Sequence, residues 1–136
     1  MAKVAVVYWS GTGNTAKMTE LVAEGATQKG ADVTIFTSAD FTKDMVADYD
    51  GIAFGCPSMG AEVLEESEFQ PMWDDVKDSL SGKKVVLYGS YGWGDGEWMR
   101  NWEDEAGSVV VETYTCNGEP SGDGEDACKE LGANLA

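Results

Sequence analysis

The sequence contains no histidine and few cationic side chains. Nine Lys and Arg residues stand against 25 Asp and Glu residues in a chain of 136, which gives a formal net charge of −16 at pH 7. This charge argues against nucleic-acid backbones and anionic membrane surfaces as partners, and it favours proteins with basic surfaces. Without histidine, a mixed Cys/His zinc site is excluded.

Cysteine is also scarce, and no long apolar run is present. The three cysteines, Cys56, Cys116 and Cys128, are odd in number and form no CxxC pair, so we expect reduced thiols and a cytoplasmic protein. The apolar stretch near the N-terminus is too short for a membrane span and lacks a small-residue cleavage site. We therefore expect no signal peptide and no membrane anchor. The length of the chain predicts a single domain over residues 1–136, and we expect a monomer.

Strand and helix patterns alternate along the chain. A continuous β-branched and aromatic run predicts the first strand, and apolar or small side chains at helical spacing predict the helix that follows it. Strands are predicted at 4–8, 32–37, 51–55, 84–89 and 109–116, and helices at 15–29, 69–80, 97–106 and 123–135. This alternation implies right-handed βαβ crossovers and an α/β fold with a doubly wound, five-stranded, mostly parallel sheet covered by helices on both faces. Ligands bind such sheets beyond the carboxyl ends of the strands.

The loop between the first strand and the first helix has the composition of a phosphate-binding loop. It ends at a helix N-terminus, where unsatisfied backbone N–H groups and the helix dipole can hold a phosphate without any Lys or Arg. An ordinary Ser/Thr N-cap with a tight turn would explain any one of its residues but not the whole run. Neither GxGxxG nor the GxxxxGK nucleotide loop is present, which disfavours dinucleotides and nucleoside triphosphates. The loop residues are Ser10, Gly11, Thr12, Gly13, Asn14 and Thr15.

Three segments at the ends of predicted strands carry a family resemblance. YWSGTGNT at 8–15, GCPSMGAEVLEES at 55–67 and GSYGWGDGEWM at 89–99 resemble the short-chain flavodoxins of anaerobic bacteria. The resemblance covers nearly the whole chain. It implies a sheet with strand order 2-1-3-4-5, one non-covalently bound flavin mononucleotide (FMN) and low-potential electron transfer between partner proteins, without enzymatic activity.

The resemblance also assigns roles to residues. The first loop of the family surrounds the FMN phosphate, the second contacts the inner face of the isoalloxazine ring, and the third lines its pyrimidine edge and covers its outer face. It places Met59 on the inner face, Glu62 at the flavin N3–H and Trp93 on the outer face. It implies that the peptide between Gly60 and Ala61 rotates on one-electron reduction, which would give Ala61 a positive φ. The implied cofactor contacts are Ser10, Gly11, Thr12, Gly13, Asn14, Thr15, Pro57, Ser58, Met59, Gly60, Ala61, Glu62, Ser90, Tyr91, Gly92, Trp93 and Gly94.

Other conspicuous residues have a simpler interpretation beside the functional one. Trp98 and Trp102, four residues apart on a predicted helix, are expected to be packing or surface residues rather than cofactor contacts. Cys56 ends a buried strand and is expected to be an inert core residue. An acidic run is either a solvated face or a docking surface for a partner, and charge alone does not decide between them. Its members are Glu62, Glu65, Glu66 and Glu68.

Three other functions compete with the electron carrier. An FMN-dependent NAD(P)H:quinone-type oxidoreductase of the same fold would show steady NAD(P)H oxidation. A signalling receiver domain needs acidic residues at the ends of the first and third strands, where this chain has Tyr8, Trp9, Gly55 and Cys56. A cofactor-free interaction module would be colourless when purified.

Overall fold

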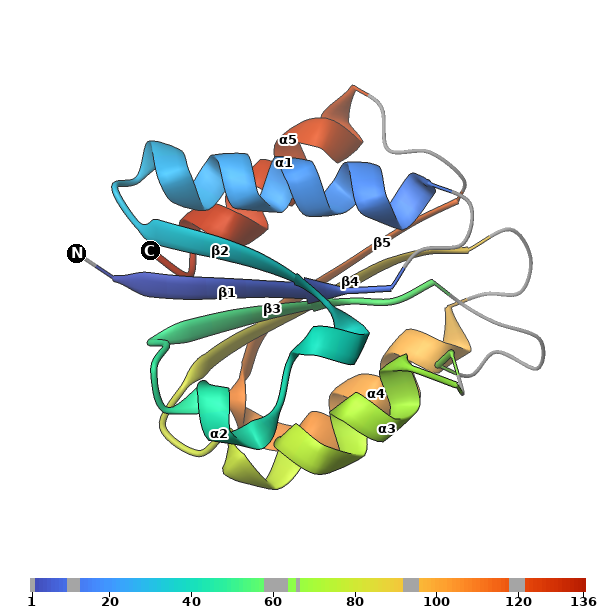
Figure 1. Cartoon of the computed structure of the whole chain (residues 1–136). Coiled ribbons are helices and arrows are strands. Elements are labelled where there is room, and N and C mark those ends of the chain that lie inside the picture. The colour runs from blue at the N-terminus through green and yellow to red at the C-terminus, as the bar shows by residue number, and fades with distance from the viewer. Residues whose placement is uncertain (1, 10–12, 58–63, 66, 92–95, 118–121) are drawn as a thin grey trace.

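Five parallel strands form one twisted sheet in the computed structural model, which describes residues 2–9, 13–57, 64–65, 67–91, 96–117 and 122–136 (Figure 1). The strands are β1 (Lys3–Tyr8), β2 (Asp32–Thr37), β3 (Gly51–Gly55), β4 (Lys84–Tyr91) and β5 (Val110–Asn117). The α-helices are α1 (Asn14–Gln28), α2 (Lys43–Val46), α3 (Phe69–Val76), α4 (Glu97–Ala106) and α5 (Asp123–Ala133).

The strand order is β2-β1-β3-β4-β5, and every paired strand is parallel to its neighbour. Helices α1 and α5 cover one face, while α2, α3 and α4 cover the other (Figure 1). This confirms the predicted fold class and strand order. The chain reverses its direction of travel across the sheet between β1 and β3, which is the position where sheets of this kind bind their ligands.

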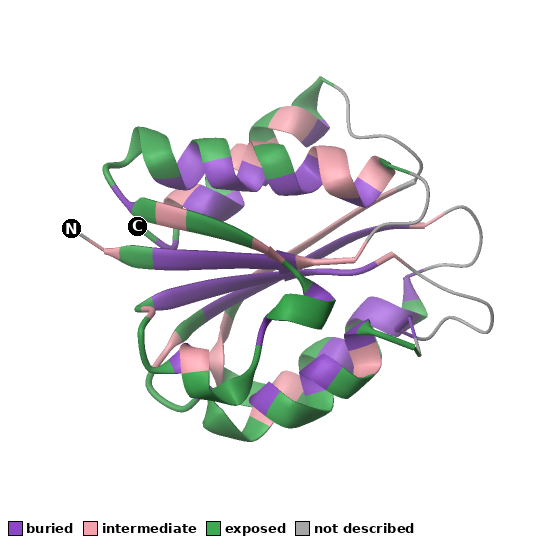
Figure 2. Cartoon of the chain, in the orientation of Figure 1, coloured by how far each residue is buried: buried purple, intermediate pink, exposed green. Residues whose placement is uncertain are grey.

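Two apolar layers, one on each face of the sheet, form the core. Side chains of β1 alternate between them: Val4 and Val6 point to the layer under α1 and α5, whereas Ala5 and Val7 point to the layer under α3 and α4. All four are fully buried, and β3 is buried along its whole length (Figure 2). Central strands covered on both faces are expected to read as unbroken apolar runs, which is why the sequence reveals them clearly.

Two glycines bring α1 and α5 into backbone contact. An ideal Cβ at Gly25 would lie 1.8 Å from the carbonyl oxygen of Lys129, and one at Gly132 would lie 1.8 Å from the carbonyl oxygen of Val22. No side chain can occupy either position without moving a helix. The spacing of these two helices therefore depends on glycine at both sites.

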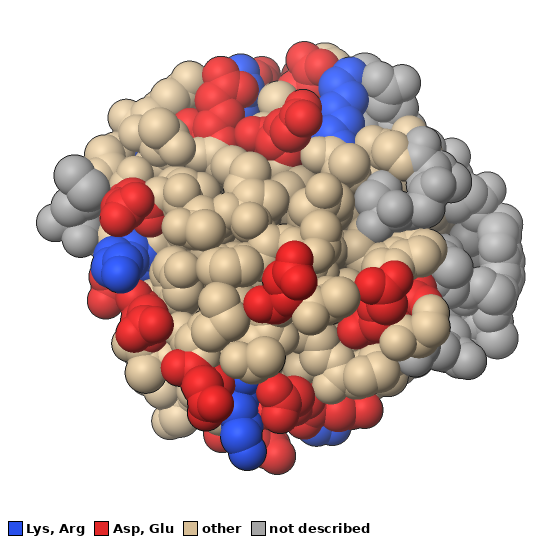
Figure 3. All heavy atoms as spheres, viewed as in Figure 1, with Lys and Arg blue, Asp and Glu red and all other residues tan. Residues whose placement is uncertain are grey.

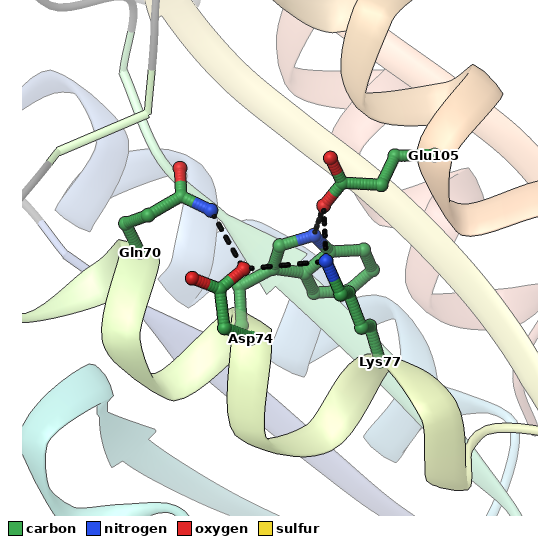
Figure 4. Close-up of polar contacts among 5 residues, drawn as sticks. Gln70, Asp74, Lys77 and Glu105 are labelled. Carbon is green, nitrogen blue, oxygen red and sulfur yellow. Dashed lines mark hydrogen bonds and ion pairs between the residues drawn. The ribbon is translucent and has the colours of Figure 1, made fainter.

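Polar contacts join α3 to α4 on the opposite face (Figure 4). The indole Nε1 of Trp73 donates to Glu105 at 2.5 Å, and the Lys77 ammonium lies 3.4 Å from both Glu105 and Asp74. The neighbouring Glu105 carboxylate raises the pKa of Lys77. The Trp73 ring is fully buried, so Glu105 supplies the acceptor for its one polar atom.

Most element boundaries differ from the sequence prediction by one or two residues. The larger differences have a physical cause. Strand β4 continues two residues further than predicted because Ser90 and Tyr91 pair with Cys116 and Asn117 of β5. The α-helical part of 69–80 ends at Val76 and continues as a 3₁₀ turn. The prediction also missed α2, which is only one turn long.

Both ends of the chain lie at the amino ends of the strands (Figure 1). Ala2, Asp50 and Ala136 line the same pocket. Among the described helices, none has the length and apolarity needed to cross a membrane.

Candidate functional site

The carboxyl ends of β1, β3 and β4 meet at one edge of the sheet, beside the N-terminus of α1 (Figure 1). Hydrogen bonds beyond the regular ladder hold these ends together. The Trp9 N–H donates to the Gly55 carbonyl at 3.0 Å, and the Cys56 N–H donates to the Tyr88 carbonyl at 3.1 Å. The first residues after β1 and β3 are thus fixed to a neighbouring strand.

Helix α4 adds a third support to this edge. The Trp98 indole N–H donates to the Cys56 carbonyl at 3.2 Å, and the Tyr91 and Trp98 ring centroids are 5.6 Å apart. A Cβ at Gly89 would lie 2.1 Å from the Cys56 carbonyl oxygen, so this close approach requires glycine. Trp98 and Trp102 are both buried, which confirms that they are packing residues. Cys56 is buried as well, and burial raises its thiol pKa to about 12, as expected for an inert core cysteine.

The predicted cofactor contacts that the structure describes lie at the start of α1 or at the carboxyl ends of β3 and β4, along the same edge of the sheet (Figure 1). Gly13, Asn14 and Thr15 begin α1, Pro57 follows β3, and the last two residues of β4, Ser90 and Tyr91, are strand rather than the predicted loop. The other predicted contacts lie outside the described residues: Ser10, Gly11, Thr12, Ser58, Met59, Gly60, Ala61, Glu62, Gly92, Trp93 and Gly94.

The N-terminus of α1 has the features of an anion site. Its N-cap is Gly13, which has φ 95° and therefore a left-handed backbone that favours glycine. No side chain caps the helix, and its first turn contains no Asp or Glu. The backbone N–H groups of a first helical turn have no acceptor within the helix, so they and the helix dipole are available to an external anion.

The other described α-helices all have a carboxylate at this position. The first turns of α2, α4 and α5 contain acidic residues, among them Asp44, Glu97 and Asp123. Helix α3 has none within its first turn, but the carboxylate of Glu65 accepts hydrogen bonds from the Glu68 and Phe69 N–H groups at 2.7 and 2.9 Å. Only α1, among the described α-helices, begins without a carboxylate.

Glu65 fits neither of the two interpretations of the acidic run, the solvated face or the docking surface. The side chain is 5% exposed, so Glu65 belongs neither to a solvated face nor to a docking surface. Burial acts to raise its pKa, but hydrogen bonds from the Ser67 hydroxyl and from the backbone N–H groups of Phe69, Glu68 and Ser67 outweigh burial and lower it from 4.5 to about 2. Glu68 is exposed, whereas Glu62 and Glu66 lie outside the described residues.

Thr15 provides the test of whether this site suits a phosphate. Its side-chain hydroxyl is buried and has no hydrogen-bond partner, although a buried hydroxyl without a partner is costly. A phosphate oxygen at the N-terminus of α1 would supply that partner. The local residues therefore fit an FMN phosphate.

Two residues that the sequence analysis did not single out, Thr19 and Tyr88, support the first turn of α1 from the side of the sheet. The Thr19 hydroxyl donates to the Thr15 carbonyl at 2.9 Å and lies 2.5 Å from the Tyr88 hydroxyl. Thr19 follows Thr15 by one helical turn, so the sequence alone could have indicated that the two residues lie next to each other on the same face of α1. Nothing in the sequence distinguishes Tyr88 from any aromatic residue in a buried strand.

The fold and the edge just described define a doubly wound α/β protein with a candidate anion site at the first strand-to-helix junction. The Flavodoxin family model matches residues 6–134. The chain is 47% identical over 134 residues to a flavodoxin of Clostridium beijerinckii, covering 96% of this chain and 97% of that one. It is 46% identical over 136 residues to a flavodoxin of Megasphaera elsdenii, covering 98% of each. A solution structure of two-electron reduced M. elsdenii flavodoxin superposes with a TM-score of 0.89 at 44% identity, over 97% of both chains.

The chain therefore belongs to the flavodoxin family, and its relatives are of the short-chain type that the sequence motifs indicated. As a flavodoxin it is an electron carrier that holds FMN, and not an enzyme. No finding favours the quinone-type oxidoreductase.

Proposed function

We propose that the N-terminus of α1, together with the residues 10–15 that lead into it, binds the phosphate of FMN. The buried Thr15 hydroxyl that lacks a partner carries this proposal. The uncapped first turn supports it, because every other described α-helix has a carboxylate there. Bound in this way, the phosphate would be held by neutral donors, and its negative charge would remain.

The isoalloxazine ring would lie along the edge formed by the ends of β3 and β4. By the family resemblance, Met59 and Trp93 would cover its two faces, Glu62 would accept from its N3–H, and the backbone at Ser90 and Tyr91 would line its pyrimidine edge. FMN supplies the redox chemistry, because it takes up and releases electrons one at a time. The chain's own part is to orient the ring, exclude water from it and bind its oxidation states with different strength, which sets the reduction potentials.

Binding of FMN and riboflavin, which differ by the phosphate, tests the phosphate assignment. We expect one FMN per chain and much weaker riboflavin binding. Thr15→Val should raise the Kd for FMN about tenfold to a hundredfold, because a hydrogen bond to a charged group contributes roughly 1.5 to 3 kcal/mol, and should leave riboflavin binding unchanged.

A stability measurement separates this effect from a folding defect. Since the Thr15 hydroxyl has no partner without flavin, flavin-free Thr15→Val should be at least as stable to urea as flavin-free wild type. Equal binding of the two flavins by the wild type would rule out the phosphate assignment.

We further propose that the partners are redox proteins with basic surfaces. The support is the net charge of −16, and Asp and Glu clearly outnumber Lys and Arg on the face shown in Figure 3. Electron transfer to such a partner should slow steeply with added salt, because the screening length falls from about 10 Å at 0.1 M to about 3 Å at 1 M. Stopped-flow rates over this range test it, and a flat profile with a basic partner would contradict it.

We also propose a monomeric, single-domain, cytoplasmic protein. None of the three cysteines forms a disulfide, and Cys56 and Cys128 are buried, which suits a reducing compartment. Sedimentation of the flavin-loaded protein tests the oligomeric state.

A further inference from the structure

A buried chain of hydroxyl groups connects the centre of the sheet to the first turn of α1. Tyr88, on β4, is fully buried, and Thr19, on α1, is 2% exposed. Their oxygens are 2.5 Å apart, and the Thr19 hydroxyl is 2.9 Å from the Thr15 carbonyl oxygen. Thr15 and Thr19 lie one turn apart on α1, whereas Tyr88 comes from a strand that is distant from them in the sequence.

The direction of the protons along this chain follows from the acceptor at its end. A carbonyl oxygen can only accept, so the single hydroxyl proton of Thr19 points to Thr15. Tyr88 must then donate its own proton to the Thr19 oxygen. Burial raises the pKa of Tyr88, which keeps the phenol protonated and able to donate. Both donors point toward the N-terminus of α1.

The position of the Tyr88 hydroxyl is itself tightly constrained. Its oxygen lies 2.6 Å from where an ideal Cβ on Gly55 would be, and two ring carbons lie 2.3 Å from it. A residue larger than glycine at 55 would displace the ring. Gly55 therefore leaves the space that lets the phenol reach α1.

We propose that Tyr88 and Thr19 are positioning residues for the phosphate site, and that they raise its affinity by holding the first turn of α1 and strengthening its donors. This inference rests on the proposed phosphate assignment. The Thr15 carbonyl belongs to the same peptide group as the Ala16 N–H, which is one of the first-turn donors without an acceptor in the helix. A second hydrogen bond to that carbonyl polarises the peptide and makes its N–H a stronger donor to an anion.

The variants Thr19→Val and Tyr88→Phe remove each hydroxyl with little change of shape. We expect the FMN Kd to rise about threefold to tenfold for Thr19→Val and less for Tyr88→Phe, with riboflavin binding unchanged. The double variant should match Thr19→Val, because Tyr88 acts only through Thr19. Thr19→Ser, which keeps the hydroxyl, should restore the wild-type Kd.

Thr27→Val is a matched control. The Thr27 hydroxyl donates to the Ala23 carbonyl at 2.9 Å, which is the same bond in the same helix at its other end. Its removal should leave binding of both flavins unchanged. A second readout uses no flavin: inorganic phosphate titrated into the flavin-free full chain, followed by the amide resonances of residues 14–17, should bind more weakly to Thr19→Val than to wild type.

The outcomes separate the two proposals. Wild-type protein that binds FMN and riboflavin equally contradicts the phosphate assignment itself. Wild-type protein that prefers FMN, with the same preference in Thr19→Val and Tyr88→Phe, overturns the positioning role. Equal weakening of both flavins in these variants would indicate a general structural role and would also overturn it.

Discussion

The sulfur of Cys56 accepts a hydrogen bond from the backbone N–H of Glu65 at 3.4 Å. This contact joins the residue after β3 to the residue whose carboxylate caps α3. The two ends of segment 57–64 are thereby fixed to each other. The same segment carries the residues that family resemblance assigns to the inner face of the flavin.

Removal of the Glu65 carboxylate should destabilise the protein. Glu65→Ala leaves the first N–H groups of α3 without an acceptor, and we expect a loss of about 2 kcal/mol in the free energy of unfolding, measured by urea denaturation. Glu68→Ala is the matched control, because Glu68 is exposed, and it should change stability by no more than about 0.5 kcal/mol. Equal effects of the two substitutions would contradict the capping role.

The same carboxylate should make stability depend on pH. Its pKa is lowered from 4.5 to about 2 on folding, so its contribution is fully present above pH 4.5 and is lost as the pH falls toward 2. The difference in unfolding free energy between wild type and Glu65→Gln, up to about 2 kcal/mol at pH 7, should therefore shrink between pH 5 and 2. A difference that stays constant over this range would mean that Glu65 is not ionised in the folded protein.

The Tyr88 and Thr19 hydroxyls should also be coupled in stability. Thr19→Val leaves the buried Tyr88 hydroxyl without its acceptor, which should cost about 1 to 3 kcal/mol in the flavin-free protein. Adding Tyr88→Phe removes that orphaned group, so the double variant should be more stable than Thr19→Val alone. Additive losses in a double-mutant cycle would show that the two hydroxyls do not interact.

Alanine should not be tolerated where α1 and α5 touch. In an exposed helix, Gly→Ala usually stabilises by about 1 kcal/mol, but a Cβ at Gly25 would lie 1.8 Å from the Lys129 carbonyl. We expect Gly25→Ala to destabilise by about 2 kcal/mol or more, because the helices must separate. Glu20→Ala, at an exposed position of the same helix, serves as the control. Thermal unfolding of both variants would show whether alanine at position 25 lowers the stability instead of raising it.

The sequence predicted most of the fold because its signals are local. Buried runs such as β3 read as strands, and apolar spacing on α1 reads as a helix. Strand β4 was predicted too short because the pairing of Ser90 with Cys116 depends on a strand distant in sequence. Glu65 stands among other acidic residues in the sequence and was therefore grouped with them. That its carboxylate caps the helix beginning at Phe69 is visible only in the structure. The role inferred for Tyr88 required the three-dimensional contact with Thr19.

The placement of the chain ends bears on how this carrier could be attached to other molecules. Ala2 and Ala136 line one pocket at the amino ends of the strands, and the first turn of α1 lies at the opposite end of the sheet (Figure 1). A tether fused to either terminus, such as a reductase domain or a surface anchor on an electrode, would leave the edge proposed to bind FMN facing away from the point of attachment. A short linker could also join the two termini and allow the chain to be opened elsewhere.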